Sequence, residues 1–145
     1  MNDKYDALKL DNQLCFPLYA CAREVVKKYK PFLDDIGLTY TQYVTMLVLW
    51  EKPEVTSKEI GERLHLDSGT LTPVIKKLAD KDLVTRRRAP EDERNLVVAL
   101  TDAGLALRDR AARIPGQMAG CVRLDPEDAR TLYRILYQLL EGVSC

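Results

Sequence analysis

The chain has 145 residues, in which 22 lysines and arginines are balanced by 22 aspartates and glutamates. This length favours one domain, or one protomer of an intertwined assembly. A formal net charge of zero argues against a generally basic protein, so any contact with a polyanion must come from local clusters of charge. No apolar run is long enough to span a membrane, and the N-terminus lacks the pattern of a signal peptide, so we expect a cytoplasmic protein.

The first predicted element is a long helix from about Asp11 to Lys30. Pro17 lies near its start, where it either marks the first turn or bends the helix, because proline removes one backbone hydrogen bond. Pro31 and Gly37 interrupt the pattern that follows. The apolar residues that recur at helical spacing are Leu14, Leu18, Cys21, Val25 and Val26.

Two short helices joined by a turn are expected in the middle of the chain. Before them, residues 39–42 can cap a helix over residues 43–50. The turn between the short helices falls at His65–Leu66, which makes the pair a helix-turn-helix. Each helix has two candidate N-cap residues. These are Thr56 or Ser57 for the first helix and Asp67 or Ser68 for the second. The inward-facing apolar residues are Ile60, Leu64, Leu71, Ile75 and Leu78.

A β-hairpin and two further helices are expected after the helix-turn-helix. Residues 83–85 and 96–100 are β-branched runs around a turn at residues 89–92. Another helix runs to about Ile114 and is interrupted by Pro115–Gly116. A last amphipathic helix starts at Asp125 and runs through about Leu140. The pattern predicts a mostly α fold with a small β-hairpin wing, which is a winged helix-turn-helix.

The winged helix-turn-helix carries residue types that suit DNA. In this arrangement the second helix can enter a major groove, and the wing can reach the adjacent minor groove. Asp92 can hold the Arg94 guanidinium extended toward that groove. Solvated surface charge is the alternative, which the ordered set of elements disfavours. The candidate DNA contacts are Ser68, Gly69, Thr70, Thr72, Lys76, Lys77, Arg86, Arg87, Arg88, Asp92 and Arg94.

The four cysteines do not form a metal-binding pattern. There is no CxxC motif, and the only histidine, His65, is distant from them in sequence. We therefore expect no metal and no cofactor. From the residues alone, Cys15 can be either a packed hydrophobic residue or a reactive thiol. The four cysteines are Cys15, Cys21, Cys121 and Cys145.

Four sequence stretches resemble the MarR family of winged-helix repressors, across essentially the whole chain. LHLDSGTLTPVIKKL matches the recognition helix, and DERNLVVALTDAG matches the wing, including its arginine at Arg94 and the partner Asp92. LDNQLCFPLYA and LTYTQYVTMLVLWE are similar to the organic hydroperoxide regulator branch. The resemblance implies an intertwined helical homodimer that represses a peroxide-detoxification gene from double-stranded operator DNA. It implies dimerisation helices in residues 10–38 and 115–145, around a DNA-binding region in residues 39–114.

The same resemblance assigns the signal to an organic hydroperoxide that oxidises Cys15. The supporting tyrosines are then Tyr19, Tyr29 and Tyr40. The reaction needs a thiolate, which a helix N-terminus or phenol hydroxyls would favour. Tyr19 shares the helix face of Cys15. Tyr29 lies roughly 21 Å from Cys15 along the helix axis, which is too far for contact within one chain. If Tyr29 contacts this sulfur, it must come from a second, antiparallel chain.

Oxidation would give a sulfenic acid that can condense with a second thiol. Cys121 is the favoured resolving residue and Cys145 the next, while a small cellular thiol is the alternative. Cys21 lies about 240° round the helix from Cys15 and faces elsewhere. Two other functions stay open. One is a MarR-type regulator released by a small phenolic or lipophilic ligand. The other is a thiol peroxidase, which the lack of an arginine beside Cys15 disfavours.

Overall fold

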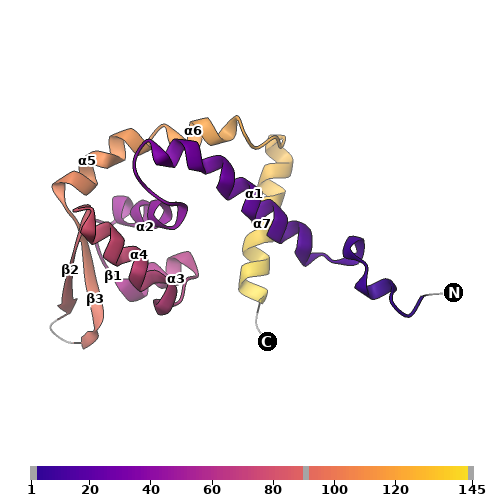
Figure 1. The fold of residues 1–145 in the computed structure, drawn as a ribbon, viewed down its shortest axis with the longest axis horizontal. Coiled ribbons are helices and arrows are strands. Elements are labelled where there is room, and N and C mark those ends of the chain that lie inside the picture. The colour runs from indigo at the N-terminus through magenta and orange to yellow at the C-terminus, as the bar shows by residue number, and fades with distance from the viewer. Residues whose placement is uncertain (1–2, 90–91, 144–145) are drawn as a thin grey trace.

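The structure is a computed structural model that describes residues 3–89 and 92–143, and it begins with a short arm and a long helix (Figure 1). The arm holds η1 (Asp6–Leu8) and η2 (Leu10–Asn12), and α1 spans Cys15–Asp34. Pro17 is the third residue of α1, where its missing N–H breaks no bond, so the helix begins near it rather than bending there. The later elements are α2 (Tyr40–Glu51), β1 (Glu54–Thr56), α3 (Ser57–Leu64), α4 (Ser68–Asp80), β2 (Val84–Ala89), β3 (Asp92–Leu100), α5 (Asp102–Ala111), α6 (Ile114–Ala119) and α7 (Pro126–Gly142).

Polar caps set where the helices of the helix-turn-helix region begin. At the start of α2, the Thr39 hydroxyl accepts the backbone N–H of Gln42 (3.3 Å), and the Gln42 side chain accepts that of Thr39 (3.1 Å). The helix therefore starts three residues before the predicted Tyr43. Thr56 caps α3 and Asp67 caps α4, which decides between the candidates that the sequence left open.

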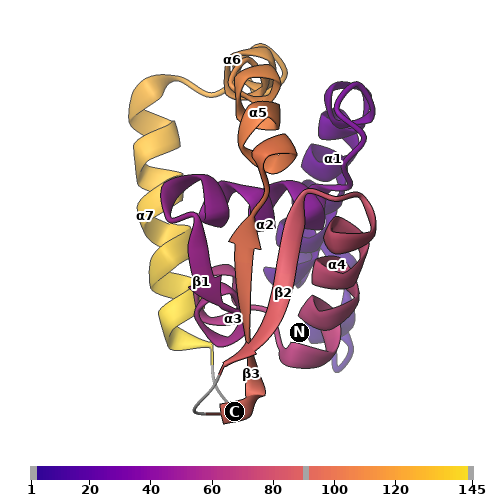
Figure 2. The ribbon, with the colours of Figure 1, turned by 90° about the vertical axis from the view of Figure 1, so that its left-hand side faces the viewer.

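The wing is a three-stranded antiparallel sheet in the order β1-β3-β2, with α4 beside β2 (Figure 2). Its strands β2 and β3 are longer than predicted. The first strand was predicted to end at Thr85, whereas Arg86, Arg87 and Arg88 lie within β2, so that boundary was wrong. The strand β1 was missed because three residues are too few for an alternating pattern to be recognised.

The break predicted at Pro115–Gly116 was also misplaced. The structure ends α5 at Ala111 and starts α6 at Ile114, so Pro115 lies in the first turn of α6. That position suits proline, because the first N–H groups of a helix have no intrahelical acceptor. Cys121 is the second residue after the end of α6.

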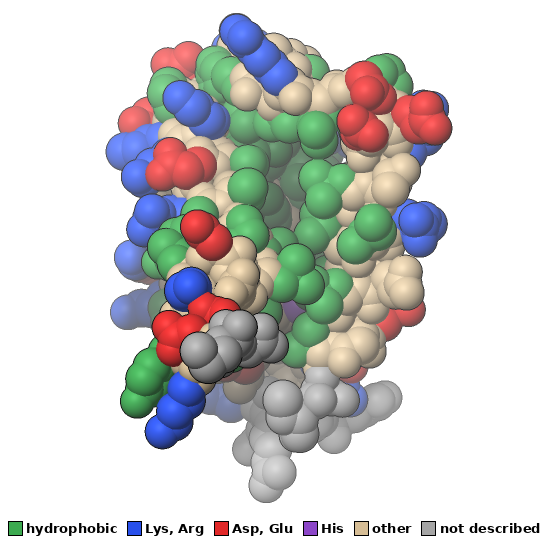
Figure 3. Space-filling view, turned by 90° about the vertical axis from the view of Figure 1, so that its right-hand side faces the viewer, with side chains coloured by type: hydrophobic (Ala, Val, Ile, Leu, Met, Phe, Trp, Pro, Cys, Tyr) green, Lys and Arg blue, Asp and Glu red, His purple; other side chains and the backbone are tan. Residues whose placement is uncertain are grey.

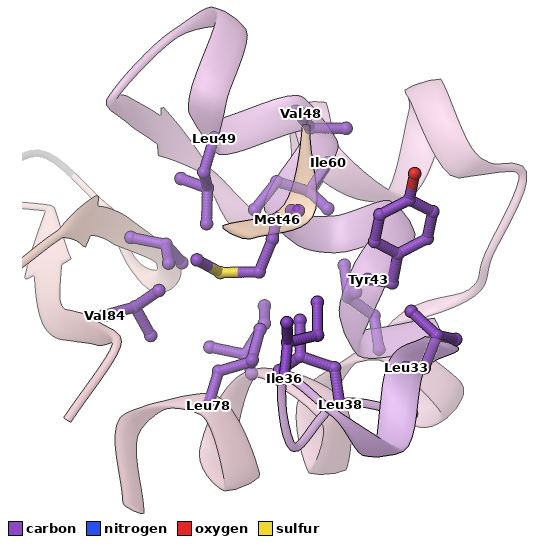
Figure 4. Close-up of a cluster of buried hydrophobic side chains, with 14 of the residues drawn as sticks. Leu33, Ile36, Leu38, Tyr43, Met46, Val48, Leu49, Ile60, Leu78 and Val84 are labelled. Carbon is purple, nitrogen blue, oxygen red and sulfur yellow. The ribbon is translucent and has the colours of Figure 1, made fainter. Parts of the chain in front are cut away.

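The hydrophobic core lies between the helix-turn-helix and the sheet. Figure 4 shows Met46 within this cluster, with Tyr43 at its edge. Met46, Leu78 and Val98 are fully buried, which fixes α4 against α2 and the sheet. In α1 the buried residue is Leu33, in the last turns, and α7 contributes none. The first part of α1 and all of α7 therefore project from the core.

These projecting helices expose a large apolar surface, here called the α1–α7 face. Figure 3 shows hydrophobic side chains on both sides of a hollow there. Patches of this kind mark protein interfaces. None of the helices in the described residues is long and apolar enough to cross a bilayer. The exposed apolar side chains are Leu14, Phe16, Leu18, Tyr19, Val25 and Val26 of α1, and Leu132, Tyr133, Ile135, Tyr137, Leu139 and Leu140 of α7.

Candidate nucleic-acid interface and thiol site

The second helix of the helix-turn-helix, α4, has one buried and one exposed face. Leu71, Ile75 and Leu78 are buried and anchor it to the core. Every residue of α4 that the sequence assigns to DNA is on the exposed side, so the helix presents its polar face to solvent. These exposed residues are Ser68, Gly69, Thr70, Thr72, Lys76 and Lys77.

Local hydrogen bonds order the first turn of α4. The Asp67 carboxylate accepts the backbone N–H of Thr70 at 2.7 Å. Bonds from the Thr70 side chain and backbone hold the pKa of Asp67 below its usual value. The Thr72 hydroxyl donates to the Ser68 carbonyl at 2.7 Å, so its oxygen lone pairs remain available as acceptors. A Cβ added at Gly69 would lie 3.6 Å from its nearest neighbour, an Asp67 oxygen, so this turn leaves space for a DNA backbone to approach.

The basic residues of the wing are divided between two sides of β2. Arg86, Arg87 and Arg88 are all exposed, and successive strand residues point to opposite faces. Arg87 donates to Glu54 of β1 at 2.5 Å, so its side chain extends across β3. Both side chains are more than half exposed, and this ion pair therefore adds little stability. The side chains of Asp92 and Arg94 lie outside the described residues.

Cys15 is an exposed thiol at the first position of α1. Its neighbours Leu14, which is 84% exposed, and Phe16, which is 43% exposed, belong to the α1–α7 face, so Cys15 lies beside this apolar surface. The first turn of a helix has unpaired N–H groups and the positive end of the helix dipole, both of which favour an anion.

The other described cysteines are exposed as well. Cys21 lies within α1, and Cys121 lies beyond α6. The Cys121 thiol is 3.7 Å from the backbone carbonyl of Gln117, to which it donates. Cys145 lies outside the described residues. The Cys121 thiol is therefore accessible, and the resolving role of Cys121 or of Cys145 stays a prediction.

Two of the three predicted supporting tyrosines lie together, at the far end of α1 from Cys15. The ring centroids of Tyr29 and Tyr40 are 5.0 Å apart, and Tyr43 completes the group at 5.8 Å from Tyr29 and 6.3 Å from Tyr40. The sequence prediction missed Tyr43, although it is three residues after Tyr40 on the same side of α2. We call Tyr29, Tyr40 and Tyr43 the tyrosine cluster.

Burial raises the pKa of all three phenols in the tyrosine cluster. Tyr29 further raises the pKa of Tyr40, and both raise that of Tyr43, since charging one phenol disfavours charging its neighbours. All three therefore remain protonated at neutral pH and can act as hydrogen-bond donors.

Within one chain the tyrosine cluster cannot reach the thiol. Fourteen residues of α1 separate Tyr29 from Cys15, which amounts to roughly 21 Å. Tyr19 is closer, one helical turn after Cys15, and its ring packs under the Arg23 guanidinium at 5.4 Å. A site with all four residues requires a second protomer.

Comparison with known proteins identifies the family. The family model described as "Transcriptional regulator SarA/Rot" matches residues 27–110. The organic hydroperoxide resistance transcriptional regulator of Bacillus subtilis is 48% identical over 141 residues, which cover 97% of this chain and 96% of that protein. The chain belongs to the MarR/SarA-type winged-helix regulators, in the organic hydroperoxide resistance branch. This confirms the family and the fold that the sequence predicted.

Solved structures of AbfR from Staphylococcus epidermidis share the fold of this regulator. Reduced AbfR bound to DNA is 34% identical with a TM-score of 0.78, over 97% of this chain and 98% of that chain. Overoxidised AbfR bound to DNA is 33% identical over the same shares, with a TM-score of 0.77. The disulfide form is 33% identical over 96% and 94%, with a TM-score of 0.62. This regulator is thus more similar in conformation to the DNA-bound forms.

Proposed function

We propose that this protein is a peroxide-responsive transcriptional repressor that binds double-stranded operator DNA as a homodimer. The observation that carries the proposal is the placement of Cys15, an exposed thiol at the start of α1 beside the apolar α1–α7 face. Oxidation of a thiol at this place changes the contacts between the two protomers. The sequence identity with an organic hydroperoxide resistance regulator supports an organic hydroperoxide as the signal. As a DNA-binding regulator, the protein acts in the cytoplasm and without enzymatic turnover.

DNA binding rests on α4 and the wing. In the proposed complex, Ser68, Gly69, Thr70 and Thr72 at the start of α4 lie in the major groove, against base edges and phosphates. Lys76 and Lys77 contact the phosphates. The wing residues Arg86, Arg87, Arg88 and Arg94 serve the adjacent groove, with Asp92 as the partner of Arg94. All of these except Asp92 and Arg94 have side chains that the structure describes as exposed.

The dimer rests on residues 10–38 and 115–145, which include the α1–α7 face. Burying the exposed leucines, valines and tyrosines of that face against a second copy provides the driving force. An antiparallel arrangement of the two α1 helices brings the tyrosine cluster of one protomer to the partner's Cys15. Tyr29 and Tyr40 of one protomer then donate hydrogen bonds to the partner's thiolate. Tyr19 donates to the same thiolate from the chain that contains this Cys15.

The signal is a two-electron oxidation of Cys15. The thiolate sulfur attacks one peroxide oxygen, the O–O bond breaks, and the alkoxide takes a proton from water and leaves as an alcohol. The sulfur becomes a sulfenic acid, while the peroxide is reduced. The thiol of Cys121 from the partner then attacks this sulfur, which forms a disulfide and releases water. AbfR, solved both overoxidised on DNA and as a disulfide, supports a disulfide rather than a sulfur oxide as the releasing form.

Fluorescence anisotropy tests this function. The probe is a labelled duplex that the reduced protein selects from a random-sequence library, and tert-butyl hydroperoxide is the oxidant. We expect wild-type protein to release the duplex on oxidation and to bind it again after dithiothreitol. The Cys15→Ser variant should bind the duplex with unchanged affinity and keep it in the presence of peroxide. Release of the duplex from Cys15→Ser would contradict the proposal.

A further inference from the structure

A lysine at the end of the recognition helix bridges two segments of the fold. Lys81 is the C-cap of α4, and its ammonium donates to the Gly37 carbonyl at 2.5 Å and to Gln42 Oε1 at 2.8 Å. Gly37 lies in the connection between α1 and α2, and Gln42 lies in the first turn of α2, so both acceptors are about forty residues earlier in sequence. The end of α4 is thereby tied to this connection by charge-assisted hydrogen bonds.

The two acceptors have defined positions, one in the α1–α2 connection and one in the first turn of α2. Gly37 adopts a φ of +70°, which orients the turn after α1, and Gln42 is only 3% exposed and closes the capping box of α2. On the other side, Arg110 of α5 donates to the carbonyl of Asp35. Side chains of α4 and α5 therefore both bind the backbone of this connection.

The tyrosine cluster lies on the two helices that this connection joins. Tyr40 is the first residue of α2 and follows directly on the cap residue Thr39, while Tyr29 packs on Tyr40 from α1. A displacement of these rings must therefore move the first turn of α2, which includes Gln42. Lys81 links that turn directly to the end of α4.

We propose that Lys81 is a positioning residue that transmits displacement of the tyrosine cluster to the recognition helix. When oxidation of Cys15 removes the hydrogen bonds that hold the tyrosines, the first turn of α2 shifts, and the bonds of Lys81 move the end of α4 with it. This inference rests on the proposed function. Without the lysine, Leu71, Ile75 and Leu78 still seat α4 in the core. The reduced protein therefore still binds DNA, but it responds less to oxidation.

The test compares Lys81→Met with wild type and with Lys52→Met, whose lysine pairs with the exposed Glu59 at 3.3 Å. Anisotropy with the selected duplex gives the Kd of full-length protein before and after tert-butyl hydroperoxide. Mass spectrometry verifies equal oxidation of Cys15 in each sample. We expect the reduced Kd of Lys81→Met to stay within about threefold of wild type. Its loss of affinity on oxidation should be at least about tenfold smaller than in wild type and Lys52→Met, or about 1.4 kcal/mol of lost coupling.

An oxidation response in Lys81→Met equal to that of wild type would overturn the inference. Equal weakening of the reduced and oxidised Kd would overturn it too, because a merely structural role predicts that result. If Lys81→Met does not fold, Lys81→Gln, which keeps a neutral donor, is measured in the same way. Failure of the proposed function is distinct, since wild-type protein would then not respond to peroxide at all.

Discussion

The rings of Tyr29 and Tyr40, eleven positions apart in sequence, lie with their centroids 5.0 Å apart and join α1 to the first turn of α2. Their burial raises the pKa of both phenols, so they are neutral donors whose positions are fixed before any thiolate arrives. Preorganised donors stabilise an anion without further ordering. In the proposed dimer, these two hydroxyls donate hydrogen bonds to the sulfur of the partner's Cys15.

Replacing Tyr40 by phenylalanine should slow the oxidation of Cys15. The ring still packs on Tyr29, but one hydrogen bond to the thiolate is lost, and bonds to charged groups contribute about 1.5–3 kcal/mol. We expect a rate at least about tenfold lower, measured by quenched-flow mass spectrometry with tert-butyl hydroperoxide. Tyr5→Phe, in the amino-terminal arm, is the control. Equal rates in Tyr40→Phe and Tyr5→Phe would show that the hydroxyl has no part in the reaction.

Burial of the tyrosine cluster also predicts a pH dependence of stability. Because the pKa of Tyr29, Tyr40 and Tyr43 is higher in the folded than in the unfolded state, the folded protein binds protons more tightly. The stability that follows is fully present below the unfolded pKa of about 10 and is lost as the pH rises through the folded values. Urea denaturation of the triple phenylalanine variant, at pH 8 to 11, should show a shallower decline than wild type. A decline of the same slope would contradict the assignment.

Lys76 should contribute to DNA affinity through a phosphate contact. Alanine at this position should weaken binding to any duplex sequence by a similar factor. It should also reduce the slope of log Kd against log salt by about 0.9, the value for one phosphate contact. Anisotropy titrations from low to moderate salt measure the slope, with Lys52→Ala as the control. An unchanged slope in Lys76→Ala would place the lysine outside the interface.

Gly104 should be intolerant of any side chain. A Cβ at this position would overlap the carbonyl oxygen of Leu83, and the Gly104 carbonyl accepts the Trp50 indole N–H at 2.9 Å. We expect Gly104→Ala to lower the free energy of unfolding by about 3 kcal/mol. Gly116→Ala, whose Cβ would meet no atom within 4 Å, is the matched control and should change it by less than about 1 kcal/mol. Equal stability of the two variants in urea denaturation would disprove this close packing.

The sequence predicted the helix-turn-helix because its signals are local. The caps Thr56 and Asp67, and the apolar spacing of Ile60 and Leu71, are set within single helices. The strand lengths were not predictable in this way. The three arginines of β2 form backbone pairs with β3, and this pairing overrides their weak local preference for strand. The pairs are Arg86 with Val98, Arg87 with Val97 and Arg88 with Leu96.

The candidate site was predictable only in part. Cys15 and three tyrosines followed from the motif resemblance, and the axial distance to Tyr29 already required a second chain. The bonds of Lys81 to Gly37 and Gln42 were not predictable, because they join residues about forty positions apart and no local pattern marks such contacts.

Mass spectrometry of peroxide-treated protein shows whether oxidation of Cys15 releases the DNA. The DNA-bound protein is treated with one equivalent of tert-butyl hydroperoxide, and the released and retained fractions are digested with and without reductant. We expect the released fraction to carry modified Cys15, linked to Cys121 by a bond that the reductant cleaves. A released fraction in which Cys15 is still an unmodified thiol would contradict this expectation.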